Sequence, residues 1–119
     1  MHFTPSHEWI VCQADIGTIG ITLYAQKELG EIVYIELPAV GKQIKKGEEM
    51  AVLESTKAAA DIYSPVTGLI IEINQDLVED CSKINRSPEK EGWICKIQME
   101  DLSEVNALIS SEEYQTLIG

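Results

Sequence analysis

The sequence predicts a mainly β fold, in which short strands form a sandwich or barrel and a helical segment follows at the C-terminus. Short stretches rich in Val, Ile and Thr recur through most of the chain. Glycines and prolines separate these stretches at close intervals, as turns do between short strands. From Asp101 onwards the apolar residues recur with the spacing of a helix.

The composition indicates a single acidic domain that covers residues 1–119. Hydrophobic residues make up 45% of the chain, which is enough for a core, and the net charge is −11. Such a surface repels phosphate backbones and anionic membranes, so we expect neither nucleic acid nor a membrane as a partner. The charge provides solubility, or it complements a basic face on a partner protein.

The N-terminal stretch "MHFTPSHEW" resembles neither a secretory signal nor an organelle transit peptide. No apolar run in the chain reaches the length of a transmembrane helix. We therefore expect a cytoplasmic protein, or a mitochondrial one whose leader has been removed.

The first third of the chain predicts three strands and one short helix. "HEWIVC" and "GTIGIT" have the β-branched residues and alternation of strands. "LYAQKELG" predicts one or two helical turns, with Thr22 as the N-cap and Gly30 just past the end. "EIVYIELP" predicts a strand that Pro38 ends. Strict alternation would divide its side chains between two faces, with Ile32, Tyr34 and Glu36 opposite Val33, Ile35 and Leu37.

The middle of the chain predicts further strands joined by tight turns. Turns around Gly41 and Gly47 have a short strand between them and lead into the strand "EEMAVLE". "ADIYSPVTGLIIEIN" predicts two strands with a turn at Pro65–Gly68 between them. "NQDLVED" predicts one helical turn, "CSKINRSPEKEGW" is rich in turn residues, and "WICKIQM" predicts the last strand.

The C-terminal segment predicts two helical parts. Asp101 or Ser103 would cap the first part, and Ser110 or Ser111 would cap the second. Acidic side chains follow the second cap, where they favour the helix dipole. The apolar side chains of the segment would pack on the sheet: Leu108, Ile109, Tyr114, Leu117 and Ile118.

No catalytic or metal-binding group stands out. The three cysteines, Cys12, Cys81 and Cys95, are odd in number and far apart, so we expect neither a disulfide framework nor a zinc site. His2 and His7 near the N-terminus suit satisfied or solvated side chains better than metal ligands. Nothing selects a catalytic triad, so we expect a protein that is not an enzyme.

One lysine, Lys57, occupies the tip between the strands of "VLESTKAAADIYSP". Short polar residues and three alanines flank it. A reactive lysine needs a desolvating pocket, which such a tip does not offer. The residue is either an ordinary soluble turn lysine or a handle, an amine that a modifying enzyme can grip and acylate.

The stretch "VLESTKAAADIYSPVTG" resembles the lipoyl-lysine site of the glycine cleavage system H proteins. The resemblance continues in order through "PSHEW", "GTIGITLYAQKELGEIVYIELPAVGKQIKKGE", "EGWICKI" and "SSEEYQTLI", and so covers essentially the whole chain. Biotin carriers differ because methionines flank their lysine. Lipoyl domains of 2-oxo acid dehydrogenases have an Asp-Lys-Ala tip and lack the extra terminal segments.

The resemblance implies a barrel-sandwich hybrid with lipoic acid in amide linkage to Lys57. It implies that a lipoate ligase or lipoyl transferase recognises the tip residues Glu54, Ser55, Thr56 and Ala58. It also implies a monomeric, non-catalytic carrier that serves three enzymes of the glycine cleavage system. These are glycine decarboxylase with pyridoxal phosphate, an aminomethyltransferase with tetrahydrofolate, and dihydrolipoyl dehydrogenase.

The resemblance further implies a cleft that shelters the loaded arm from water. By position, its residues are Ser6 and Glu8 from "PSHEW" and Asp61 from "KAAAD". Two carboxylates and a hydroxyl suit an ammonium group, because charge-assisted hydrogen bonds are the stronger kind. The alternative is a turn serine and two ordinary solvated acids.

Several residues depart from the pattern of the family. Leu23 stands where an aspartate is common, which removes a favourable charge from the start of a helix. Leu69 stands where a polar residue is usual, so an apolar side chain would be exposed. The segment Ser87–Glu91 also differs. These departures concern the partner-docking surface more than lipoylation.

Three functions remain open at this stage. The first is a lipoyl carrier of glycine cleavage. The second is a lipoyl carrier outside glycine cleavage, such as a lipoyl relay, which needs no pocket for an ammonium group. The third is an unmodified structural or adaptor domain.

Overall fold

Nine strands form two antiparallel sheets in the computed structural model, which describes residues 1–119. The larger sheet has six strands in the order β1-β2-β3-β9-β8-β5, and the smaller has three in the order β4-β6-β7. In chain order the strands are β1 His2–Phe3, β2 Glu8–Gln13, β3 Ile16–Ile21, β4 Ile32–Glu36, β5 Gln43–Ile44, β6 Glu49–Ser55, β7 Ala59–Tyr63, β8 Gly68–Ile73 and β9 Cys95–Met99. The prediction of a mainly β fold with two sheets is confirmed.

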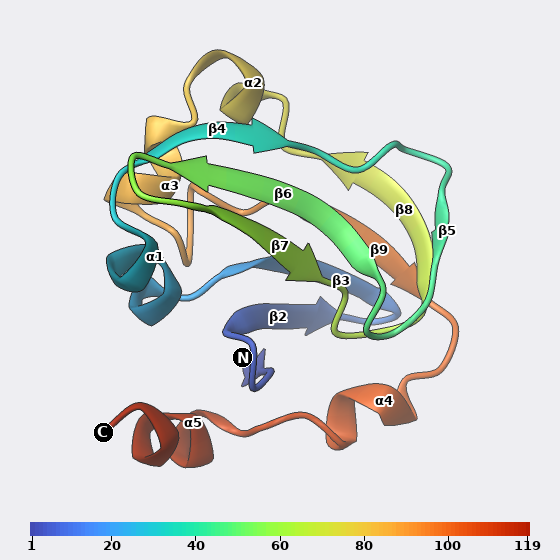
Figure 1. The fold of residues 1–119 in the computed structure, drawn as a ribbon. Coiled ribbons are helices and arrows are strands. Elements are labelled where there is room, and N and C mark those ends of the chain that lie inside the picture. Colours follow the sequence, from blue (N-terminus) through green and yellow to red (C-terminus); the bar gives the residue numbers. More distant parts are fainter.

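Five short helices lie around the sheets. They are α1 Leu23–Leu29, α2 Asp76–Glu79, α3 Ser82–Arg86, α4 Ser103–Asn106 and α5 Ser111–Ile118. The smaller sheet lies across the larger one, and the C-terminal helices α4 and α5 run beside the N-terminal strands (Figure 1). No helix combines the length and the apolar character that crossing a membrane requires.

The core lies between the two sheets and contains 19 buried side chains. Alternation along β9 buries Cys95, Ile97 and Met99, while Leu53 of β6 faces them from the smaller sheet with no exposed surface. A second cluster of Phe3, Trp9 and Tyr114 joins β1 and β2 to helix α5. This cluster anchors the C-terminal segment to the N-terminal one.

Helix α1 has the boundaries that the sequence predicts. The Thr22 hydroxyl accepts a hydrogen bond from the Ala25 N–H at 3.1 Å, and Gly30 follows with φ +85°. The first turn contains no acidic residue, as the departure at Leu23 implies. However, the Leu23 N–H donates to Oε2 of Glu89 at 2.8 Å. A carboxylate from a distant loop therefore stands at the start of the helix in place of a local aspartate.

The predicted division of β4 into two alternating faces is wrong. Ile32 and Ile35 are both buried, although strict alternation puts them on opposite faces, and Val33 and Tyr34 are both exposed. The reason is a shift in the pairing of β4 with β6 between Ile32 and Tyr34. Such a bulge adds one residue to the strand and reverses the facing of those that follow.

The C-terminal segment follows its prediction in part. Ser110 forms a capping box with Glu113 at the start of α5, as predicted. The N-cap of α4 is Leu102 and not Asp101 or Ser103, although Oδ1 of Asp101 accepts from the Ser103 N–H at 3.0 Å just before the helix. Tyr114 is buried as expected, but Leu117 is 56% exposed. Ile118, and not Leu117, packs against the cluster of Phe3, Trp9 and Tyr114.

The sequence did not predict one strand and one helix of the structure. Strand β1 has two residues, which is too short for a pattern, and α3 lies in the segment interpreted as turns. Leu69 is 36% exposed, as expected of an apolar residue at a usually polar position.

Candidate functional site

The hairpin of β6 and β7 ends in a tight turn that presents Lys57. The Ser55 N–H donates to the carbonyl of Ala58 at 2.8 Å. The Ser55 hydroxyl accepts from the N–H groups of Lys57 and Ala58, both at 3.1 Å, and donates to the Ala58 carbonyl at 3.2 Å. Ser55 thus provides hydrogen-bond partners for most backbone groups of the turn and holds the turn in a defined shape.

The side chain of Lys57 is exposed and has no hydrogen-bond or ion-pair partner. It passes over Gly30, where a methyl group would lie 3.1 Å from Cε of Lys57. The Thr56 N–H donates to the carbonyl of Glu31 at 3.0 Å, which ties the tip to the end of α1. The amine is therefore free for chemistry while the turn beneath it is held.

The other three predicted tip residues surround this turn. Glu54 is exposed at the end of β6, opposite Ala59 in the register, and Thr56 and Ala58 are exposed on either side of Lys57. An enzyme that approaches the amine therefore meets short side chains and one carboxylate.

A cleft of about 380 Å³ lies beside the N-terminal segment. Glu8 lines it and is only 1% exposed. Its Oε1 accepts hydrogen bonds from the hydroxyls of Thr4 at 2.5 Å and Ser6 at 2.6 Å, and its Oε2 accepts from the N–H of Tyr63 at 3.3 Å. Oε2 therefore retains more acceptor capacity than Oε1.

The rest of the cleft is largely apolar. Its other lining residues come from the N-terminal segment, from the β5–β6 and β7–β8 turns, and from the C-terminal segment: Phe3, Pro5, Lys46, Gly47, Ser64, Pro65, Ala107, Leu108 and Ile109. A buried carboxylate at the base of an apolar cleft can bind a group that has a cationic end and an aliphatic stem.

The structure brings Ser6 and Glu8 together but does not bring Asp61 to them. Asp61 is exposed on β7 and is not among the residues that line the cleft. It shares the outer face of β7 with Ala59 and Tyr63, whose side chains are also exposed. That face runs from the tip at Lys57 towards the cleft at Tyr63, over a strand length of at most about 20 Å.

Sequence reasoning missed Thr4 and the N–H of Tyr63 as partners of Glu8. Thr4 lies four residues before Glu8, and its Oγ1 also accepts from the Glu8 N–H at 3.0 Å. The short spacing "TPSHE" is a local signal that could have suggested Thr4. Tyr63 is distant in sequence, so only the packing of β7 against β2 reveals it.

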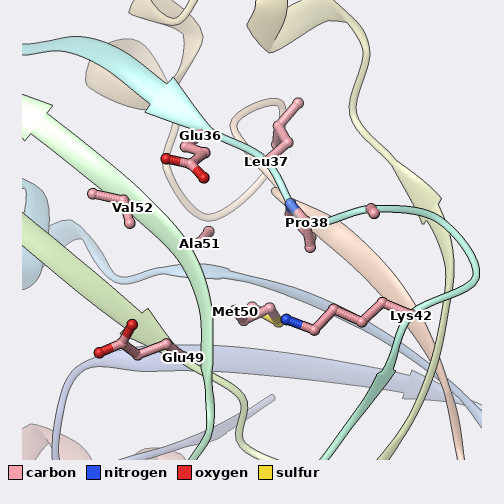
Figure 2. A pocket seen from close by; sticks show the side chains of 9 residues that line it. Glu36, Leu37, Pro38, Lys42, Glu49, Met50, Ala51 and Val52 are labelled. Atoms are coloured by element: carbon pink, nitrogen blue, oxygen red, sulfur yellow. The ribbon is translucent and has the colours of Figure 1, made fainter.

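A different hollow of about 330 Å³ lies on the smaller sheet, between the end of β4 and the start of β6. Figure 2 shows that the Lys42 side chain extends across it towards Met50, while the carboxylates of Glu36 and Glu49 point elsewhere. None of these three charged groups forms an ion pair. The hollow lies towards the opposite end of β6 from Lys57 and contains no nucleophile next to a base, so it is not the candidate site.

The cysteines form no disulfide and lie outside the cleft. Burial raises the pKa of the Cys95 thiol to about 12, and its Sγ lies 3.5 Å from Sδ of Met50. Burial also raises the pKa of Cys12. These thiols remain protonated near neutral pH. No group of three or more His, Cys, Asp or Glu side chains is placed to hold a metal ion.

Comparisons with known proteins identify the family of the chain. The sequence profile of the glycine cleavage H-protein family matches residues 1–119. The chain belongs to the glycine cleavage H-protein family. It is 43% identical to the glycine cleavage system H protein of Caulobacter vibrioides over 119 residues, which are 100% of this chain and 98% of that protein.

Similar members of the H-protein family come from distant organisms. A probable glycine cleavage system H protein 1 of Sulfolobus acidocaldarius is 48% identical over 95% of this chain and 82% of its own length. A crystal structure of the H protein of Mycobacterium marinum superposes with a TM-score of 0.89 at 33% identity, and covers 98% of this chain and 94% of that one. A putatively assigned relative in Schizosaccharomyces pombe is mitochondrial.

Membership establishes the general role of the chain. H proteins are lipoyl-bearing carrier subunits of the multi-enzyme glycine cleavage system, and this chain is a lipoyl carrier in that system.

Proposed function

We propose that Lys57 carries lipoic acid in amide linkage and that the arm transports the aminomethyl group of glycine. The carrier visits glycine decarboxylase, the folate-dependent aminomethyltransferase and dihydrolipoyl dehydrogenase in turn. It performs no catalytic step itself. A tethered cargo gains effective concentration at each docked enzyme, which is the benefit of a carrier.

The residues at the tip fit this group. Lys57 is exposed and unpaired, and its neighbours Thr56 and Ala58 have short side chains. The Ser55 hydrogen bonds hold the turn that a lipoate ligase or lipoyl transferase grips. Glu54 supplies the one carboxylate beside it.

When attached, the lipoyl group would supply a strained disulfide that accepts two electrons as it opens, so that one sulfur would take the aminomethyl cargo and the other would become a thiol. The residues of this chain shelter that cargo. The apolar wall of the cleft excludes water, which slows hydrolysis of the loaded arm. Ser6 and Glu8 face the ammonium end, and Oε2 of Glu8 has acceptor capacity for it.

Asp61 has a separate part in this proposal. It stands on the outer face of β7, between the tip and the cleft. We propose that its carboxylate pairs with the ammonium group as the arm lies along this face. Asp61, Ser6 and Glu8 would then surround the ammonium group as a cage of polar side chains.

The observation that favours glycine cleavage over a lipoyl relay is the buried Glu8 in the cleft, whose carboxylate accepts three hydrogen bonds and keeps acceptor capacity on Oε2. A relay or a simple adaptor needs no such pocket. We further propose that the carrier acts as a monomer in the cytoplasm, or in mitochondria if it is a processed organelle protein.

The test measures the lifetime of the loaded arm by intact mass, as the aminomethyl group is lost. The variant Asp61→Asn is best suited, because Asp61 is exposed and its replacement should leave the fold intact. Glu8→Ala also removes the acceptor, but it leaves the Tyr63 N–H and two hydroxyls without their partner and so costs stability.

Both variants should be lipoylated normally and should lose the cargo faster than the parent. Glu36→Gln, another exposed acid on the same sheet, is the matched control and should change nothing. If the loaded arm of both Asp61→Asn and Glu8→Ala has the parental lifetime, the cleft assignment is wrong. The result would then favour the lipoyl relay function.

A further inference from the structure

The turn that leads from Ser6 to Glu8, the first residue of β2, contains a residue in an unusual conformation. His7, between them, has φ +71°, in the left-handed region that residues other than glycine seldom adopt. Such a conformation persists only where its surroundings enforce it.

Three hydrogen bonds close a triangle around His7. Its Nδ1 lies 2.7 Å from the hydroxyl of Tyr114, and that hydroxyl lies 2.7 Å from Oγ1 of Thr22. The Thr22 N–H donates to the carbonyl of His7 at 3.1 Å. Thr22 thus holds the backbone of His7 directly and its side chain through Tyr114.

Tyr114 itself is fixed by packing. It is 2% exposed, and its ring stacks on Phe3 with centroids 4.3 Å apart and planes 5° from parallel. It belongs to α5, which is 107 residues away in sequence from His7. Burial raises the pKa of Tyr114, so its hydroxyl remains neutral and can donate as well as accept.

We propose that the hydrogen-bonded triangle of His7, Tyr114 and Thr22 is a latch that positions the carboxylate of Glu8 for the loaded arm. His7 and Tyr114 are positioning residues, because neither lines the ammonium end of the cleft. The inference rests on the proposed cleft function and adds residues to it.

His7 lies directly between two of the residues that line the cleft. If the latch opens, the backbone of His7 can return to an ordinary region of φ and ψ. Ser6 and Glu8 flank it directly, so their side chains then change direction. The bond from the Tyr63 N–H to Oε2, at 3.3 Å already long, is the contact most sensitive to such a shift.

The test begins with amide hydrogen exchange in the unlipoylated protein, which reports local opening without the arm. Tyr114→Phe removes one hydroxyl and keeps the ring that stacks on Phe3. Tyr24→Phe is the matched control, because its ring also contacts His7 but its hydroxyl has no partner. His7→Gly gives a second variant that tolerates the positive φ without the imidazole.

Tyr114→Phe and His7→Gly should each speed exchange of the Glu8 and Tyr63 amides by about two- to tenfold, the range that loss of one hydrogen bond represents. The amide of Ile97 in the core should not change. In the lipoylated protein, both variants should shorten the lifetime of the loaded arm by a similar factor. The double variant should be no worse than His7→Gly alone, because both changes break the same latch.

Two results would overturn the inference. One is parental exchange at Glu8 and Tyr63 in Tyr114→Phe, or an equal rise at Ile97, which indicates only global destabilisation. The other is an unchanged lifetime of the loaded arm. The Asp61→Asn variant, measured in parallel, separates the two proposals. If it shortens the lifetime while Tyr114→Phe does not, the cleft function stands and the latch fails.

Discussion

Gly30 ends helix α1 and lies beneath the side chain of Lys57. Its replacement by alanine tests whether backbone strain at Gly30 or contact with Lys57 affects stability. Its φ of +85° and ψ of −156° lie in a region that is nearly exclusive to glycine. An alanine there should cost about 1–3 kcal/mol of backbone strain. The new methyl would lie 3.1 Å from Cε of Lys57, but that exposed side chain can rotate away, so the contact should add little.

The expected change in melting temperature follows from chain length. An unfolding entropy of about 2.1 cal/mol/K per residue means that each kcal/mol lowers the Tm of a chain of this size by roughly 4 °C. Gly30→Ala should therefore lower the Tm by about 4–12 °C in differential scanning calorimetry. Glu28→Ala, an exposed change in the same helix, should stay within about 2 °C of the parent.

A Lys57→Ala background separates strain from contact. If the backbone of Gly30 is the cause, Gly30→Ala lowers the Tm equally in both backgrounds. If Gly30→Ala lowers the Tm only when Lys57 is present, the contact with the lysine side chain, and not the backbone strain, causes the loss of stability. A Tm within about 2 °C of the parent in both backgrounds would refute the reasoning altogether.

Three further predictions concern a helix start, a thiol and a pH dependence. Glu89→Gln should lower the free energy of unfolding by about 0.3–1 kcal/mol in urea, and adding Leu23→Asp should restore it; no effect of Glu89→Gln would mean that the carboxylate does not stabilise α1. Cys95, with its pKa raised by burial, should resist maleimide in the native state and react only after unfolding; rapid native labelling at Cys95 by mass would contradict this. The backbone N–H and then the hydroxyl of Ser110 lower the pKa of Glu113, so its contribution to stability is present above its ordinary value of 4.5 and is lost as pH falls through the lower folded value. Glu113→Gln should therefore reduce the Tm difference between about pH 7 and about pH 3, and an unchanged difference would exclude this role.

The sequence predicted those parts of the fold that depend on local chemistry. Thr22 and Gly30 bound α1 because a hydroxyl cap and a positive φ are properties of single residues. Ser110 begins α5 for the same reason. The lysine tip was also predictable, because Lys57 lies between two recognisable strands.

The parts that the sequence did not predict depend on contacts between distant residues. The bulge in β4 lets Ile32 and Ile35 both reach the core, which alternation alone does not reveal. The carboxylate of Glu89 reaches Leu23 across 66 residues. The changed loop at Ser87–Glu91 therefore places a carboxylate at the helix start that lacks its own acid, although the sequence presents the two as separate departures.

The residues of the candidate site also differ in how far the sequence predicts them. Ser6 and Glu8 lie within one short turn, so their proximity follows from the motif that contains them. The third proposed member, Asp61, lies on another sheet and faces outward, so its part in the cage depends on the arm itself. Tyr114 has no pattern in the sequence that associates it with His7.

The central claim is that Lys57 is the single attachment point of the lipoyl group. The most direct measurement is the intact mass of the protein purified from its own source, followed by peptide mapping, with Lys57→Arg prepared in the same cells. The account predicts a mass increase of one lipoyl group, located on Lys57 and absent from Lys57→Arg. A parental protein with no such increase, or an increase that survives Lys57→Arg, would contradict it.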